Sequence, residues 1–116
     1  MTKCILVMNL TRMGDLVQST PLIAGLRKKY PDSRITLMVS SDFEAFAPRI
    51  PHIDEILVFN LRQFNEKKDS GELQSWVQVY HYLKTFLEGV KQRDFDEVYN
   101  LSLSKLSAVM LSYLNI

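Results

Sequence analysis

Short apolar runs alternate with helix-forming segments along the whole sequence, and this alternation is its most restrictive feature. The first run, Cys4 to Met8, is continuous and ends in polar residues, which is typical of a central strand buried on both faces. Further strands are predicted at Arg34–Val39, Glu55–Phe59 and Glu97–Leu101, and helices at Asp15–Lys29, Phe43–Ala47, Leu73–Val90 and Ser102–Leu114. A β-α-β-α-β-α-β-α order predicts an α/β fold with a parallel sheet, right-handed crossovers and helices on both faces.

Two segments depart from simple strand and helix patterns. Pro21 lies inside the first predicted helix, where it removes the hydrogen bond to the carbonyl of Val17 and predicts a kink. Residues 60–71 are almost all polar, and they are predicted to form a long loop between the third strand and the next helix.

Length and composition exclude several classes of protein. The chain has 116 residues, enough for one domain over 1–116, and its 14 basic and 13 acidic residues leave a net charge of +1. We therefore expect no nucleic-acid partner. A single cysteine excludes a disulfide within the chain and a Cys-rich zinc site, and His52 and His81 have no metal-ligand spacing, so no metal is expected. No apolar run is long enough to cross a membrane, so we expect a soluble protein that at most lies on a membrane surface.

In open parallel sheets, ligands bind beyond the carboxyl ends of the strands. The loop after the first strand, Asn9 to Gly14, combines a hydroxyl, a guanidinium and a lone glycine, and Asp15 follows it. It matches neither common phosphate-loop motif. Asp15 has two interpretations: an acid stabilised by the positive end of the helix dipole, or a general base at the mouth of the sheet. Asp94 and Asp96 also match a two-aspartate metal motif, but they precede a strand and are predicted to form a turn.

The run from Leu6 to Ile23, with its Met-Gly-Asp and Thr-Pro-Leu pieces, resembles the opening of the ADP-heptose:lipopolysaccharide heptosyltransferases, glycosyltransferase family 9. The segments Leu26–Thr36, Pro51–Ile56 and Asp94–Leu101 are similar to later parts of the same family's first domain. The resemblance covers nearly the whole chain. It implies a Rossmann-like domain that forms the N-terminal half of a GT-B type enzyme, in which two such domains face a cleft.

The resemblance also implies an activity: inverting, metal-independent transfer of heptose from an ADP-heptose donor to the lipopolysaccharide inner core, without a cofactor. The family's proposed base falls on Asp15. Thr11, Arg12, Met13 and Gly14 fall on the segment that lines the acceptor side. Arg12 has two interpretations, a contact to an anionic group of the acceptor or a solvated loop cation.

The family's nucleotide-sugar site lies mostly in a second domain. We therefore expect residues 1–116 to be an acceptor-side domain that does not transfer sugar alone. The last predicted helix is apolar on more than one face, and we expect the missing domain or a partner chain to cover it. The alternative is a self-contained flavodoxin-like binding or regulatory module whose first loop holds a phosphate or a partner protein.

Overall fold

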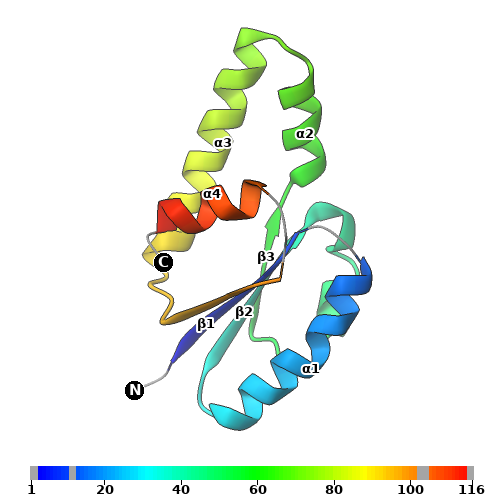
Figure 1. Cartoon of the computed structure of the whole chain (residues 1–116), viewed down its shortest axis with the longest axis vertical. Helices are drawn as coiled ribbons and strands as arrows, with labels where there is room; N and C mark the ends of the chain where they lie inside the picture. The colour runs from blue at the N-terminus through cyan, green and yellow to red at the C-terminus, as the bar shows by residue number, and fades with distance from the viewer. Residues whose placement is uncertain (1–2, 11–12, 102–104, 115–116) are drawn as a thin grey trace.

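The computed structural model describes residues 3–10, 13–101 and 105–114, and its centre is a parallel sheet of four strands. The strands are β1 (Cys4–Asn9), β2 (Arg34–Ser40), β3 (Glu55–Phe59) and β4 (Glu97–Asn100), in the order β3-β2-β1-β4 (Figure 1). β1 pairs in parallel with both β2 and β4. The predicted parallel sheet is confirmed, and so is the central place of the most apolar strand.

Two apolar clusters occupy the two faces of this sheet, because side chains alternate in direction along each strand. Ile5 and Val7 belong to the cluster that includes Ile23 and Leu26 of α1 (Met13–Lys29). The cluster on the other face combines side chains of β1 and β2 with side chains of α3 (Leu73–Gln92) and α4 (Lys105–Leu114): Leu6, Met8, Met38, Leu87, Val90 and Met110. Helices therefore cover both faces, as predicted.

The prediction of a loop over residues 60–71 is wrong, because most of this segment forms α2 (Leu61–Asp69). The Asn60 side chain caps this helix by accepting a hydrogen bond from the Gln63 backbone N–H at 3.0 Å. Leu61 and Phe64, three residues apart, pack against the cluster under α3. Two apolar side chains on one face and an N-cap residue suffice to hold a helix whose other residues are polar.

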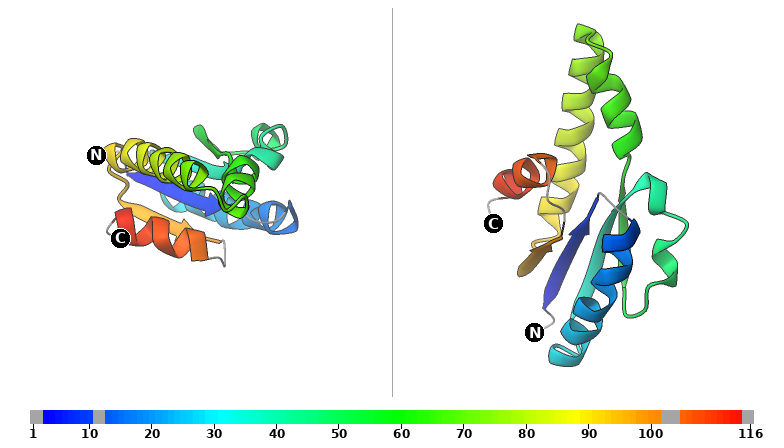
Figure 2. Two further views of the ribbon diagram at one scale, coloured as in Figure 1. Left: turned by 90° about the horizontal axis from the view of Figure 1, so that it is seen from above. Right: turned by 45° about the vertical axis from the view of Figure 1, so that its right-hand side comes forward.

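α2 and α3 form a helical hairpin that extends beyond the sheet (Figures 1 and 2). The described chain is accordingly elongated, with extents of 47 × 28 × 20 Å. Gly71 stands between the two helices with a φ of +74°, a conformation that other residues adopt only with strain. The hairpin starts directly after β3, at the edge where the parallel strands end.

Other boundaries differ from the predictions by small amounts. The predicted helix Phe43–Ala47 is replaced by two single 3-10 turns, Ser41–Phe43 and Ala47–Arg49, and Pro48 lies near the start of the second turn. Ser40 caps the first of these turns, because its hydroxyl oxygen accepts a hydrogen bond from the Asp42 backbone N–H at 3.3 Å. α1 begins at Met13, two residues before the predicted start, and it continues through Pro21.

Ion pairs concentrate at the amino edge of the sheet. Arg27 donates to the Asp54 carboxylate at 2.6 Å and to the backbone carbonyls of Ser33 and His52. Although desolvation acts to raise the pKa of Asp54, hydrogen bonds from the Ile35 N–H and from Arg27 outweigh it, so this pKa lies below its usual value. At neighbouring Glu55, hydrogen bonds from two arginines also lower the pKa: Arg34 and Arg93.

These two lowered pKa values predict acid sensitivity of the fold. A carboxyl group whose pKa is lower in the folded chain stabilises the fold above its unfolded pKa of about 4, and that contribution is lost as the pH falls through the folded pKa. We expect the free energy of unfolding, measured in urea, to decrease as the pH falls below about 5. The double variant Asp54→Asn, Glu55→Gln should lose less stability on acidification than the wild type. An equal loss of unfolding free energy in the wild type and the double variant would contradict the assignment of the acid sensitivity to Asp54 and Glu55.

Candidate functional site

The carboxyl ends of the four strands form one edge of the sheet, and the candidate site lies there. β1 ends at Asn9, β2 at Ser40 and β4 at Asn100, while β3 leads through Asn60 into α2. Figure 1 shows α1 beginning beside this edge and the α2–α3 hairpin rising from it. The ion pairs described above lie at the opposite, amino edge of the sheet.

Polar side chains at the ends of β2, β3 and β4 have hydrogen-bond partners within the domain. The Ser41 hydroxyl donates to Asn60 Oδ1 at 3.3 Å, and the Asn60 backbone N–H donates to the Tyr82 hydroxyl at 2.8 Å. The Asn100 side-chain amide donates to the Ser107 hydroxyl at 3.2 Å. These bonds tie the sheet edge to α3 and α4.

Asn9, at the end of the central strand, differs from these neighbours. Its side chain is 1% exposed, and within the described part of the chain neither Oδ1 nor Nδ2 has a hydrogen-bond partner. Asn9 is paired in register with Val39, which belongs to the cluster under α1 together with Ile5 and Val7. Its side chain therefore lies on the α1 face of the sheet. A buried amide without partners destabilises a fold by roughly 1–3 kcal/mol.

Three of the five predicted site residues form the first turn of α1, four residues after the end of β1. These are Met13, Gly14 and Asp15, and the structure describes their backbone. Thr11 and Arg12 lie outside the described residues. The first N–H groups of a helix have no partner within the helix and, with the dipole, favour negative charge or oxygen acceptors nearby. The backbone of Asp15 is thus at the predicted edge, and its role as a base stays a prediction.

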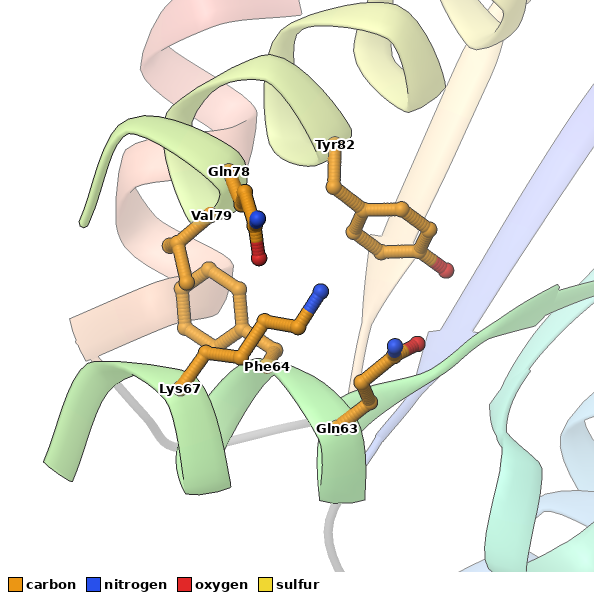
Figure 3. Close-up of a pocket in the computed structure, with 6 residues that line it drawn as sticks. All are labelled: Gln63, Phe64, Lys67, Gln78, Val79 and Tyr82. Carbon is orange, nitrogen blue, oxygen red and sulfur yellow. The ribbon is translucent and has the colours of Figure 1, made fainter. Parts of the chain in front are cut away.

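A small cavity lies between the two helices of the hairpin, and sequence reasoning missed it because residues 60–71 were predicted as a loop. Its volume is about 110 Å³. Figure 3 shows the Lys67 side chain crossing it between Gln78 and Gln63, with Tyr82 opposite; Phe64 and Val79 complete the lining. This volume is well below the ~300–1,000 Å³ of sites for drug-sized ligands. The cavity can hold one charged or hydroxylated group beside a cation, and not a whole nucleotide.

Within residues 3–10, 13–101 and 105–114, no three His, Cys, Asp or Glu side chains form a group that could hold a metal ion. Asp96 instead accepts a hydrogen bond from the Cys4 backbone N–H at 2.8 Å, at the amino edge. Across the same described ranges, no helix has the length and hydropathy needed to span a membrane.

Comparison with known proteins finds similarity to heptosyltransferases. The chain is 24% identical over 102 residues to lipopolysaccharide heptosyltransferase 3 of Escherichia coli, a match that covers 88% of this chain and 27% of that protein. No family model matches the sequence. A solved glycosyltransferase family 9 protein from Veillonella parvula superposes with a TM-score of 0.74 at 23% identity, over 97% of this chain and 29% of that one.

A second solved structure, E. coli ADP-heptose lipopolysaccharide heptosyltransferase II, superposes with a TM-score of 0.68 at 21% identity, over 100% of this chain and 29% of that one. The chain therefore spans less than a third of the length of each of these relatives. The resemblance seen in the sequence motifs is confirmed by the heptosyltransferase match, and the Rossmann-like α/β fold is confirmed by both solved structures.

Proposed function

We propose that this chain is the acceptor-side domain of an inverting glycosyltransferase that transfers heptose from ADP-heptose to the inner core of lipopolysaccharide. The main support is the position of the Met-Gly-Asp turn, residues 13–15, beside the carboxyl end of the central strand in a fold shared with glycosyltransferase family 9. A second domain supplies the nucleotide-sugar site in this proposal.

In the proposed reaction, the acceptor hydroxyl attacks the anomeric carbon of heptose from the face opposite the nucleotide. Asp15 takes the hydroxyl proton, the new C–O bond forms, and the bond from the anomeric carbon to the diphosphate oxygen breaks as ADP leaves with the electron pair. The anomeric configuration inverts. The helix N-terminus keeps an aspartate ionised but weakly basic, so its proton transfer is most useful late in the attack, when the hydroxyl has become acidic.

The acceptor lies, in this proposal, along the edge from the first turn of α1 to the hairpin. Thr11, Met13 and Gly14 line it, and the Arg12 guanidinium binds an anionic group of the acceptor. Lys67 provides a second cation in the hairpin cavity. Because the acceptor is a lipid, we propose that the protein works in the cytoplasm with a peripheral contact to the inner membrane.

Acceptor binding can be tested on the 116-residue chain itself. The probe is a deacylated, heptose-deficient lipopolysaccharide oligosaccharide, titrated into ¹⁵N-labelled protein and followed by backbone amide shifts. We expect saturable shifts at Gly14, Asp15 and Lys67. A neutral disaccharide serves as the control and should leave these signals unchanged. No shift at millimolar oligosaccharide, or shifts confined to the amino edge around Glu55, would contradict the proposal.

Lys67→Gln is expected to weaken oligosaccharide binding about threefold to tenfold, since it removes one partly solvated charge-assisted contact and keeps the length of the side chain. The dissociation constant from the same titration checks this. Lys84→Gln is the matched control, because Lys84 is an exposed lysine of α3 outside the cavity. An equal effect of both substitutions would show that only net charge matters.

A further inference from the structure

Asn9 has a buried amide that the proposed chemistry does not yet use. Three observations define it: the side chain is 1% exposed, both amide atoms lack hydrogen-bond partners within the described residues, and it lies on the sheet face that α1 covers. α1 begins four residues later, at Met13. The amide thus lies at the carboxyl end of β1, on the face against which the helix bearing Asp15 packs.

The other asparagines at this edge show that the fold readily provides partners for such groups. Asn60 bonds to Gln63 and to Ser41, and Asn100 bonds to Ser107. A leucine at position 9 would continue the apolar pattern of Ile5 and Val7 on this face without leaving polar atoms unpaired. The stability of the free domain therefore does not explain why position 9 carries an amide. A role for the amide in another state of the protein does explain it.

We propose that Asn9 is a positioning residue of the transfer reaction, whose amide becomes hydrogen-bonded only when the acceptor is bound and then fixes the opening turn of α1. The inference rests on the proposed function, because it assumes that the turn containing Asp15 faces the acceptor. The amide supplies a donor and an acceptor in one rigid group, and such a group can hold a backbone N–H and a carbonyl of the turn together. That the amide has no partner among the described residues of the free domain agrees with this role.

The variant Asn9→Leu tests the inference through two opposite effects. In the 116-residue chain, we expect the Tm to rise by about 4–8 °C, since the unpaired amide is removed. In the full-length transferase, we expect kcat for heptose transfer to fall at least about tenfold with little change in the acceptor KM, since the reacting groups lose their alignment. Ser33→Ala is the matched control: Ser33 Oγ is likewise buried and unpartnered among the described residues, but it lies at the amino edge. It should leave kcat unchanged.

A lower Tm accompanied by a proportional loss of activity would overturn the inference, because Asn9 would then be an ordinary structural residue. A higher Tm with full activity would overturn it as well.

A second measurement keeps the test valid if Asn9→Leu does not fold. In the oligosaccharide titration of the wild-type chain, the side-chain NH₂ signals of Asn9 should shift at saturation, while those of Asn60 and Asn100, already hydrogen-bonded, should not. If the backbone signals of Gly14 and Asp15 shift and Asn9 does not, the positioning role is wrong and the proposed function stands. If none of these signals shift, the proposed function itself fails.

Discussion

Replacing Asp15 with asparagine is expected to lower kcat for heptose transfer by about 10²–10⁴-fold in the full-length protein. Asparagine keeps the shape of the side chain and cannot accept the acceptor proton. The donor is proposed to bind elsewhere, so the dissociation constant for ADP-heptose should change little. Steady-state kinetics with a heptose-deficient lipopolysaccharide acceptor measure the first quantity, and calorimetry measures the second.

The matched control for this prediction is Asp32→Asn, because Asp32 is an exposed carboxylate in the turn before β2, at the opposite edge of the sheet. It should leave kcat unchanged. Full turnover by the Asp15→Asn protein would remove Asp15 as the base, and the interpretation of Asp15 as a helix-stabilising acid would be left.

The largest expected effect on stability comes from Phe59→Ala. Phe59 is fully buried at the end of β3, and its ring lies 5.5, 5.2 and 5.0 Å from the rings of Phe64, Tyr82 and Phe86. It connects the sheet to both helices of the hairpin. Truncation should reduce the free energy of unfolding by about 3–5 kcal/mol, a large part of the roughly 5–15 kcal/mol available to a domain of this kind. Urea unfolding of the 116-residue chain provides the measurement.

Leu73→Ala is the comparison for Phe59→Ala, since Leu73 is 81% exposed on α3. Its effect should stay within about 0.5 kcal/mol. If truncating Phe59 changed stability no more than truncating Leu73, the hairpin would not be packed on the sheet as the structure has it.

The strands were predictable because each is a short segment rich in apolar residues and bounded by polar or turn-forming residues. β3 has the predicted bounds, and β1, β2 and β4 differ from them by one residue. Residues 60–71 were not predictable in the same way. Among the described side chains of α2, Leu61 and Phe64 pack against the core, and they do so beside α3, a helix that the sequence pattern of residues 60–71 does not itself indicate.

The candidate site was predictable in its location and not in its details. Parallel strands must end at one edge, so the position of Asp15 followed from the order of elements. The hairpin cavity depends on packing between α2 and α3, and a loop prediction for residues 60–71 excluded it. The unpaired amide of Asn9 also needs coordinates, since a sequence shows that a residue is polar and not whether its partners are present.

The most direct test of the central claim is the anomeric configuration of the product that the full-length protein forms from ADP-heptose and heptose-deficient lipopolysaccharide, determined by NMR. We expect a single heptose to be added with inverted configuration, with or without a metal chelator. Retention of configuration, or no transfer by a protein that binds both substrates, would contradict the assignment of this domain to an inverting heptosyltransferase.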